Sequence, residues 1–428
     1  MQTVKVITLG CSKNLVDSER ILKMLDDAGF KAVHEGDEAA DIVVINTCGF
    51  IGDAKEESVN TILEYVGAKN RGEIKKLFVM GCLSERYREE LNNEIPEVDA
   101  FYGKFDWTGL VDTLAKKNAG KRLYDRVITT PSHHAYLKIS EGCNRFCAFC
   151  AIPLITGRYK SRTIEDIEDE VIRLVKRGVK EFNVIAQDLS GYGSDIYGKP
   201  SLAQLIDRIS RVEGVKWIRL HYAYPAQFPY DILDVMAARP NVCAYLDIAL
   251  QHISDKVLTN MRRHITADET RKLLETMRER VPGLHIRTTL MVGFPGEDEA
   301  DFQQLMDFVA EQRFERMGAF AYCEEEGTYG AQHYCDDIPE EVKQNRLDRL
   351  MALQEGISLE HQQQKVGKTL EVVIDREEDE FYVGRTEWDS PEVDPEVLVY
   401  KDKKLSIGEF YNVKVVDALP FELIARPL

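Results

Sequence analysis

Three cysteines stand close together in the segment Cys143–Cys150, with the spacing C-x3-C-x2-C. Three thiolates packed this closely can hold one face of a 4Fe–4S cluster, and three ligands leave the fourth iron open for chemistry. A zinc loop is the alternative, but zinc normally takes a fourth Cys or His at a short spacing, and none follows within the next turn. The spacing therefore predicts an iron–sulfur centre held by Cys143, Cys147 and Cys150.

A second group of three cysteines, Cys11, Cys48 and Cys82, is spread along the N-terminal part of the chain. Each directly follows a short apolar run typical of a buried strand. The runs are Val4–Leu9, Asp41–Ile45 and Leu77–Met80. In an open α/β sheet the carboxyl ends of parallel strands meet at one edge, where ligands bind. Cysteine is also a common buried residue, but the position of all three cysteines at strand ends predicts a second three-thiolate site.

The elements that carry these cysteines belong to two α/β parts. Residues 1–125 are expected to form a βαβαβ unit with a parallel sheet. Residues 130–364 repeat a strand and a helical pattern six times, which predicts a partial (β/α)6 barrel with its functional groups at the strands' carboxyl ends. A boundary is expected near residues 119–134, and the last helix near residues 340–364. The expected core strands are Tyr136–Ser140, Glu181–Ala186, Lys216–Tyr222, Tyr245–Leu250, Leu284–Val292 and Arg316–Tyr322.

Residues 366–428 change character and predict a small antiparallel β-barrel. This segment holds eight Lys and Arg against fifteen Asp and Glu, a net charge of −7. Its acidic runs Asp375–Glu380 and Asp389–Glu396 are equally compatible with solvated loops and with a docking surface. The expected strands are Leu370–Ile374, Phe381–Arg385, Val397–Tyr400 and Phe410–Ala418.

The composition limits the class of protein. The chain has 428 residues, 44% of them hydrophobic, and a formal net charge of −18. Such a charge does not suit a general nucleic-acid binder and favours a basic partner. No stretch approaches the roughly 20 apolar residues of a membrane span, and the first residues do not form a secretory signal. Nine cysteines, an odd number, favour metal or redox roles over a disulfide scaffold, so we expect a cytoplasmic globular protein with no membrane partner.

Several other residues carry weaker signals. Cys243, Cys323 and Cys335 are expected to be buried or incidental thiols, and His133 and His134 to be exposed polar residues. His221 and His252 fall at strand ends, where a role in a site is possible but not required. The Gly-rich stretch Val292–Glu297 lacks a Walker ending. It is compatible with a tight turn or with a close backbone approach to a cofactor.

The C-x3-C-x2-C loop, with aromatic Phe149 before the last cysteine, resembles the radical S-adenosylmethionine superfamily. Together with the three strand-end cysteines and the C-terminal barrel, which is similar to a TRAM domain, it resembles the methylthiotransferases of that superfamily. The stretch Thr8–Glu19 resembles the RimO type, because the transfer-RNA enzymes usually have Gln and Met where Ser12 and Lys13 stand. Further stretches resemble the same type: Tyr136–Cys143, Leu220–Pro225 and Leu250–His252. One departure is Cys323, where the family usually has Ser after Tyr.

The resemblance implies two 4Fe–4S clusters and S-adenosyl-L-methionine as cofactors. In the superfamily the open iron of the barrel cluster chelates S-adenosylmethionine, and electron transfer yields a 5′-deoxyadenosyl radical that abstracts hydrogen. The resemblance assigns that cluster to Cys143, Cys147 and Cys150, and a sulfur-handling auxiliary cluster to Cys11, Cys48 and Cys82. A second S-adenosylmethionine is expected to donate the methyl group. The residues expected to line the cofactor mouth are Phe149, Gln187, Asp188, Gly293 and Glu297.

By this resemblance the chain adds a methylthio group to the β-carbon of an aspartate in small-subunit ribosomal protein uS12. The alternative substrate within the family is an adenosine of transfer RNA. The acidic barrel favours the basic protein, because an RNA-binding barrel should be basic. The expected partners are this ribosomal protein, possibly within the ribosome, and a reductase or other electron donor. A non-catalytic iron–sulfur carrier or ribosome-binding module is the remaining hypothesis.

Overall fold

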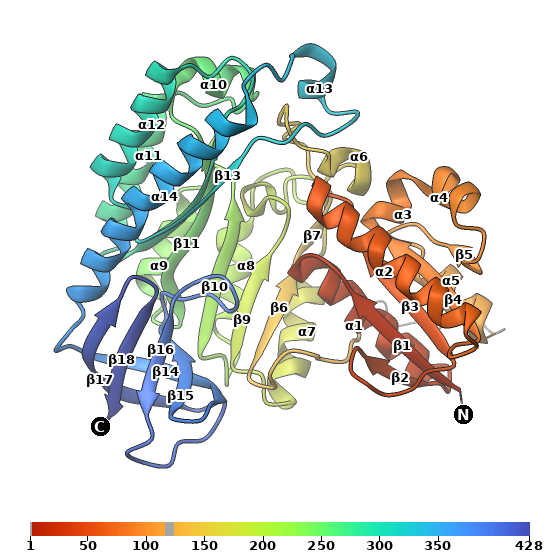
Figure 1. Ribbon diagram of the computed structural model, residues 1–428. Coiled ribbons are helices and arrows are strands. Elements are labelled where there is room, and N and C mark those ends of the chain that lie inside the picture. Colours follow the sequence, from red (N-terminus) through yellow and green to blue (C-terminus); the bar gives the residue numbers. More distant parts are fainter. Residues whose placement is uncertain (1, 116–123) are drawn as a thin grey trace.

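The computed structural model describes residues 2–115 and 124–428, which form three parts arranged side by side (Figure 1). The first part is a five-stranded parallel sheet in the order β2-β1-β3-β4-β5, with helices on both faces. Its strands are β1 (Thr3–Thr8), β2 (Lys31–His34), β3 (Ile42–Thr47), β4 (Lys76–Gly81) and β5 (Ala100–Phe101). Its helices are α1 (Ser12–Asp27), α2 (Gly52–Asn70), α3 (Cys82–Arg86), α4 (Arg88–Glu94) and α5 (Trp107–Ala115).

The central strand β3 shows why this sheet has helices on both faces. All of its residues are buried, as expected for a parallel strand covered on both sides. Val44 packs in one hydrophobic cluster with Ile21 and Leu25 of α1. Ile45 points to the opposite face and packs with Ile62 of α2. The alternation places the carboxyl end of the strand between two helical layers, where Cys48 follows it.

The second part is a six-stranded parallel sheet in the order β13-β12-β11-β10-β9-β6, and the described residues do not close it into a full barrel. Helices cover its outer face (Figure 1). Its strands are β6 (His134–Lys138), β9 (Glu181–Ile185), β10 (Trp217–Ala223), β11 (Val242–Gln251), β12 (His285–Val292) and β13 (Arg316–Ala321). Its helices are α7 (Ile164–Lys176), α8 (Leu202–Ile209), α9 (Asp231–Ala238), α10 (Asp255–Asn260), α11 (Ala267–Arg280), α12 (Glu299–Gln312), α13 (Tyr329–His333) and α14 (Glu340–Gln363).

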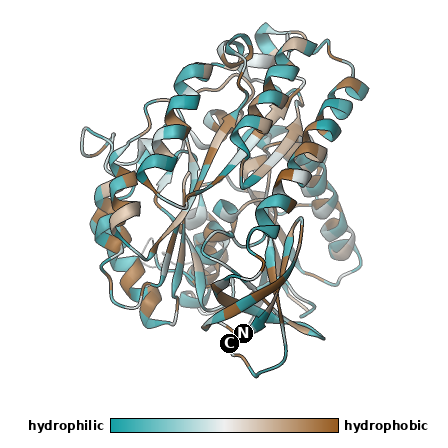
Figure 2. Cartoon of the chain, turned by 90° about the vertical axis from the view of Figure 1, so that its left-hand side faces the viewer, coloured by the Kyte–Doolittle hydropathy of each residue, from teal (hydrophilic) through white to brown (hydrophobic). Residues whose placement is uncertain are grey.

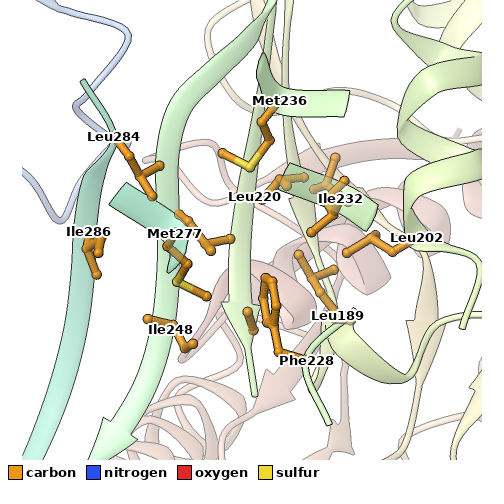
Figure 3. Packing of buried hydrophobic residues seen from close by; sticks show 14 of the residues in the cluster. Leu189, Leu202, Leu220, Phe228, Ile232, Met236, Ile248, Met277, Leu284 and Ile286 are labelled. Atoms are coloured by element: carbon orange, nitrogen blue, oxygen red, sulfur yellow. The ribbon is translucent and has the colours of Figure 1, made fainter. Parts of the chain in front are cut away.

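Apolar side chains fill the space between this sheet and its helices (Figure 3). Leu220 of β10 and Ile248 of β11 are buried with Ile232 of α9 and Met277 of α11. Full burial of a side chain of this size contributes about 1.5–3 kcal/mol each. Figure 2 shows hydrophilic and hydrophobic residues mixed along the outer helices, as expected for helices that bury one face. The sheet is therefore a rigid support for the loops at its strand ends.

The third part is a closed five-stranded barrel in the order β14-β15-β16-β18-β17. It differs from the expected antiparallel barrel in one pair, because β16 and β18 run parallel. Its strands are β14 (Thr369–Glu377), β15 (Phe381–Arg385), β16 (Glu396–Tyr400), β17 (Phe410–Leu419) and β18 (Glu422–Pro427). The expected fold class of two α/β parts followed by a small β-barrel is confirmed. The domain limits 1–125, 130–364 and 366–428 stay predictions, and the expected boundary near residues 119–134 lies partly outside the described residues.

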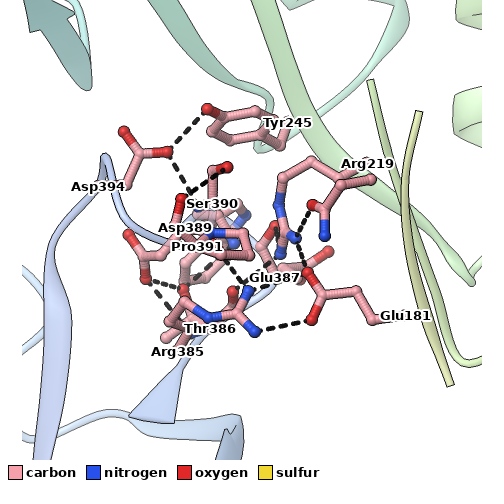
Figure 4. Close-up of polar contacts among 12 residues, drawn as sticks. Glu181, Arg219, Tyr245, Arg385, Thr386, Glu387, Asp389, Ser390, Pro391 and Asp394 are labelled. Atoms are coloured by element: carbon pink, nitrogen blue, oxygen red, sulfur yellow. Dashed lines mark hydrogen bonds and ion pairs between the residues drawn. The ribbon is translucent and has the colours of Figure 1, made fainter. Parts of the chain in front are cut away.

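The loop between β15 and β16 inserts under the core sheet, which corrects the interpretation of its acidic run (Figure 4). Asp389 is buried and forms an ion pair with Arg316 Nη2 at 2.5 Å. Asp394 accepts a hydrogen bond from Tyr245 Oη at 2.7 Å and pairs with Arg287 Nε at 3.3 Å. These carboxylates are therefore neither solvated nor free to dock a partner. The other acidic run stays exposed from residue 377 to residue 380.

His133 and His134 were expected to be exposed, and that prediction is wrong. Both are buried at the start of β6, against the C-terminal barrel. His133 Nε2 lies 2.7 Å from Asp375 Oδ1, and Arg385 donates to both oxygens of the same carboxylate. Burial lowers the pKa of His134 to about 4, aided by the charge of Arg385. The stretch around His133 and His134 is polar, and a polar sequence does not indicate that another domain will cover it.

Two elements of the first sheet and one of the barrel were not expected from the sequence. They are β2, β5 and β18. Among the described residues, we find no helix with the length and apolar character that crossing a bilayer requires.

Candidate functional site

The loop Cys143–Cys150 lies between the two-residue strand β7 (Ser140–Glu141) and the short helix α6 (Ile152–Thr156). Backbone hydrogen bonds fix its shape. Cys143 N donates to Gly157 O at 3.2 Å, and Ala148 N donates to Met261 O at 2.9 Å. Strands β7 and β8 (Lys160–Ser161) pair as a two-stranded ribbon, which joins the two ends of the stretch from residue 140 to residue 161 that contains the loop. The three thiols are free, and their short spacing in the sequence places them in one loop.

A buried arginine that no sequence pattern predicted contacts this loop. Arg263 Nη1 donates to Cys147 Sγ at 3.2 Å. Its guanidinium lies 4.2 Å from the centre of the Tyr224 ring, and Tyr224 Oη donates back to Arg263 O at 2.8 Å. A fixed cation beside a thiolate stabilises the charged form of the sulfur. This contact therefore makes the loop suitable for an anionic cysteine ligand.

Arg145 and Asp188 form a second polar anchor of the loop. Arg145 Nε donates to Asp188 Oδ2 at 2.7 Å, and the guanidinium also covers the Tyr224 ring at 4.2 Å. Asp188 is buried and accepts from Ser190 N at 2.8 Å. Asp188, which was expected to line the cofactor mouth, is therefore bound to Arg145 of the cysteine loop.

The other group is assembled from three strand ends. Cys11 follows β1, Cys48 follows β3 and Cys82 begins α3 after β4, and these three strands are neighbours in the sheet. Glycines allow the turns to touch. A Cβ on Gly10 would lie 2.8 Å from Cys48 Sγ, and Gly10 has a φ of +89°. A Cβ on Gly49 would lie 2.6 Å from Leu83 N. The structure therefore brings together the three cysteines that the sequence separates.

Polar residues under this edge connect it to the core. Asn14 Nδ2 donates to Thr47 O at 3.1 Å, and Asn14 Oδ1 lies 3.6 Å from Cys82 Sγ. Lys104 Nζ donates to the same Oδ1 at 2.9 Å and to Asp17 Oδ2 at 3.2 Å. Lys104 is only 2% exposed. A buried ammonium that contacts the same oxygen as a cysteine is a part of this site that sequence reasoning missed.

The cysteine pKa values follow from burial and from these cations. Burial raises the pKa of Cys48 and of Cys143 to about 11 in each case, and it also raises that of Cys82 and Cys150. For Cys11, desolvation acts in the same direction, but Lys13 and Lys104 outweigh it and lower the pKa. Thiols of raised pKa become good ligands when a metal supplies the compensating positive charge.

The two cysteine groups are adjacent in space. Cys82 packs in one hydrophobic cluster with Ala151, which directly follows the core loop, and with Ile155 of α6. Arg86 of α3 forms an ion pair with Glu325 of the core at 3.0 Å, and Lys55 pairs with the same carboxylate at 2.9 Å. In Figure 1 the helices α3 and α6 lie next to each other above the strand ends. The N-terminal edge therefore faces the open end of the core sheet.

The donor sets fit iron–sulfur clusters better than a single metal ion. Among the described residues, only His133, His134 and Asp375 place three candidate ligand atoms within 4.8 Å of one another, so in each cysteine group at least one pair of sulfur atoms lies further apart than that. Sulfurs bound to one zinc ion would lie only about 3.8 Å apart. A cluster instead distributes its thiolates over separate iron atoms. Both oxygens of Asp375 are occupied by Arg385, which makes that histidine pair a hydrogen-bonded contact rather than a metal site.

The remaining predicted cofactor residues lie in the cysteine loop and in the loops that follow β9 and β12. Glu297 is buried; its carboxylate accepts from Gly293 N at 2.8 Å and from Arg346 Nη1 at 2.9 Å. Phe149 is partly buried and packs beside Cys147. Gln187 is partly exposed after β9. Glu297 thus holds the Gly-rich turn in place, and cofactor contacts by Phe149, Gln187, Asp188, Gly293 and Glu297 stay predictions.

The three parts of the chain match three protein families. Residues 3–103 match the family described as Uncharacterized protein family UPF0004, residues 137–309 match the Radical SAM superfamily, and residues 366–428 match the TRAM domain.

Curated relatives match the chain over almost its whole length. It is 59% identical over 426 residues to "Ribosomal protein uS12 methylthiotransferase RimO" of Parabacteroides distasonis, covering 99% of each chain. It is 60% identical over 426 residues to the protein of the same name from Porphyromonas gingivalis, covering 99% of this chain and 98% of the relative. Among solved structures, the fold is similar to the radical S-adenosylmethionine methyltransferase TsrM from Kitasatospora setae. The TM-score is 0.60, with 14% identity and 77% of each chain covered.

Proposed function

Because this chain belongs to the RimO family of radical S-adenosylmethionine methylthiotransferases, we propose that it methylthiolates ribosomal protein uS12 at the β-carbon of an aspartate. The relatives' names support the protein substrate. A β-carbon C–H bond is unactivated and no side chain deprotonates it at pH 7, so radical hydrogen abstraction suits it.

Two 4Fe–4S clusters and S-adenosylmethionine are the proposed cofactors. Cys143, Cys147 and Cys150 would hold the first cluster. Cys11, Cys48 and Cys82 would hold the second. When bound, the first cluster and S-adenosylmethionine supply the radical that the C–H bond requires, and the second cluster supplies sulfur. An external reductase or other electron donor is part of the proposal.

The residues around the thiols have separate tasks in this proposal. Arg263 orients Cys147 and balances its negative charge. Arg145 and Asp188 keep the cysteine loop in its shape. On the other side, Lys104 and Asn14 hold the buried side of Cys82. Phe149, Gln187, Gly293 and Glu297 are proposed to border the bound S-adenosylmethionine.

The observation that carries the proposal is the adjacency of two three-thiol groups. Ala151 and Ile155, which follow the core loop, pack directly on Cys82. A substrate atom between the two groups would be within reach of both hydrogen abstraction and sulfur delivery. A simple iron–sulfur carrier has no need for two open three-ligand groups that face each other.

The test uses full-length protein purified without oxygen, loaded with iron and sulfide, and given a reductant, S-adenosylmethionine and purified uS12. We expect mass spectrometry to show an aspartate of uS12 in which a methylthio group replaces one hydrogen. Cys147→Ala should abolish the product, whereas Cys335→Ala, at an exposed thiol, should retain it. Product formation by Cys147→Ala would contradict the assignment of the core cluster.

Transfer RNA is the competing substrate, and the same assay distinguishes it. With transfer RNA in place of uS12, we expect no methylthioadenosine. If adenosine in transfer RNA is modified and uS12 is not, the substrate is transfer RNA and the proposed protein substrate is wrong. The cluster assignments would be unaffected. The exposed acidic residues 377–380 of the C-terminal barrel disfavour phosphate binding there.

A further inference from the structure

A cavity of about 440 Å³ lies between the N-terminal part and the core, apart from the cysteine site. Helices α1 and α5 form one side of it, and the ribbon of β7 and β8 forms the other. All six cluster cysteines are described, and none of them lines this cavity. Its size is that of a small-molecule binding site.

The cavity is basic although the chain is strongly acidic. Its lining residues include five cations and one carboxylate, that of Glu141, whereas the whole chain has a net charge of −18. Acidic neighbours balance some of the cations. Lys138 Nζ lies 2.5 Å from Glu141 Oε1, and Arg162 Nη1 lies 2.6 Å from Glu170 Oε2. Arg20 has two more distant acidic partners, Asp17 at 3.7 Å and Glu141 at 3.9 Å.

Two cations at the rim are left without such a partner. Arg158 and Lys160 are exposed, and within residues 2–115 and 124–428 no carboxylate forms an ion pair with either side chain. Arg158 lies over the ring of Phe146 at 4.9 Å. Two uncompensated positive charges at the mouth of a cavity favour an anionic ligand.

Buried donors in the wall also lack acceptors. Among the described residues, four lining side chains each keep one donor atom that makes no hydrogen bond. Each of these side chains is at least nine-tenths buried. The four atoms are Arg20 Nε, Trp107 Nε1, Ser140 Oγ and Arg162 Nε. These four atoms are enclosed by the protein, so they make the wall polar, while direct contacts to a ligand are left to the exposed cations.

Aromatic side chains complete the wall. Phe105 is 39% exposed, and its ring meets Trp107 edge-on at 6.0 Å. The guanidinium of Arg20 lies between the rings of Trp107 and Tyr124, at 5.3 and 5.1 Å. An exposed ring beside a cationic pocket offers a surface on which a planar group can stack.

We propose that this cavity binds a small phosphate ester that carries a planar ring, of the nucleotide type. Arg158 and Lys160 contact the phosphate, the buried guanidinium groups of Arg20 and Arg162 add positive charge behind it, and Phe105 contacts the ring. The site goes beyond the proposed function. S-adenosylmethionine is not its ligand, because that molecule has a net positive charge and no phosphate.

The experiment is isothermal titration calorimetry with full-length, iron-loaded protein and ADP at constant ionic strength. We expect Arg158→Ala/Lys160→Ala to weaken ADP binding at least tenfold. The matched control is Lys403→Ala/Lys404→Ala, which removes the same charge from exposed positions between β16 and β17 and should leave the affinity unchanged. The melting temperature of each variant without ligand shows whether it folds. The single variant Lys160→Ala, expected to bind ADP less tightly, replaces the double variant if that one does not fold.

The other probes define the ligand class. Inorganic phosphate should bind more weakly than ADP, and adenosine more weakly still. Equal affinity of ADP for both double variants, or no binding of ADP to the unaltered protein, would overturn the proposal. Displacement of ADP by S-adenosylmethionine would overturn it as well, because the cavity would then be part of the cofactor site. If an RNA tetranucleotide binds more tightly than ADP and loses affinity in Arg158→Ala/Lys160→Ala, the ligand of the cavity is RNA rather than a free nucleotide.

Discussion

The two cysteine groups offer the same three donors but are built in different ways. In the core, Cys143, Cys147 and Cys150 belong to one loop whose shape depends on nearby backbone hydrogen bonds. At the N-terminal edge, Cys11, Cys48 and Cys82 come from three strand ends. The core cysteines are therefore close together already in the sequence, whereas the N-terminal cysteines come together only through tertiary packing.

The two cysteine groups depend on different numbers of contacts from the rest of the protein. The core loop is one contiguous segment, held by the ribbon of β7 and β8, by the hydrogen bond from Ala148 N to Met261 O and by the contact of Arg263 with Cys147. The N-terminal edge needs three turns in contact, which Gly10 and Gly49 allow. It also needs Lys104, a buried cation from another segment. We therefore expect the N-terminal group to lose its metal after changes that the core group tolerates.

The largest effect on metal binding is expected from Gly49→Ala. The added Cβ would lie 2.6 Å from Leu83 N, which is backbone and yields little. We expect a loss of stability of about 1–3 kcal/mol and loss of the iron held at the N-terminal edge, with the iron of the core retained. Iron analysis and thermal unfolding measure both quantities.

The matched control is Gly356→Ala in α14, where a Cβ meets no atom within 4 Å. It should stabilise the helix by about 0.5–1 kcal/mol and leave all iron in place. If Gly49→Ala kept its full iron content, the close packing of the strand ends would not be needed for metal binding.

The next effect is expected from Lys104→Met. The change removes a buried ammonium that donates to Asn14 and Asp17, at a cost of about 1.5–3 kcal/mol. It also removes a charge that favours the Cys11 thiolate, so iron binding at this edge should weaken. Iron content and chemical denaturation give the two readouts.

Lys75→Met serves as the control, because Lys75 pairs with Asp41 on the surface. It should change stability by no more than about 0.5 kcal/mol. Equal effects of the two substitutions would show that the buried position of Lys104 is unimportant.

A smaller effect is expected in the core from Arg263→Lys. Lysine keeps the charge but loses the planar group that contacts Cys147 Sγ, the Tyr224 ring and Ala249 O. We expect iron to remain and reductive cleavage of S-adenosylmethionine to slow about tenfold. An unchanged cleavage rate would mean that Arg263 has only a packing role.

The smallest effect is expected from Cys323→Ser. Cys323 is an exposed thiol outside both cysteine groups. Both iron content and cleavage of S-adenosylmethionine should stay unchanged, and stability should change by no more than about 0.5 kcal/mol. Loss of iron in this variant would add Cys323 to one of the cysteine groups.

The sequence predicted what depends on short spacing or regular alternation. The loop Cys143–Cys150 is contiguous, and the apolar runs before Cys11, Cys48 and Cys82 marked their strands. β2, β5 and β18 were missed because they are short, exposed or weakly alternating. Their place in a sheet is set by neighbouring strands rather than by their own residues.

The sequence did not predict contacts that tertiary structure alone creates. Arg263 and Lys104 reach the cysteines from distant segments, and no local pattern marks a cation as a neighbour of a thiol. Asp389 and Asp394 belong to an acidic run, which usually indicates solvent, yet they pair with buried core residues. Buried ion pairs of this kind depend on which surface the neighbouring domain covers.

The central claim is that the chain carries two separate clusters, and iron and sulfide analysis of the reconstituted protein tests it most directly. We expect about eight iron and eight sulfide per chain. The triple change Cys11→Ala/Cys48→Ala/Cys82→Ala should leave about four of each. About four in the unaltered protein, with no decrease in the triple variant, would contradict a second cluster at the N-terminal edge.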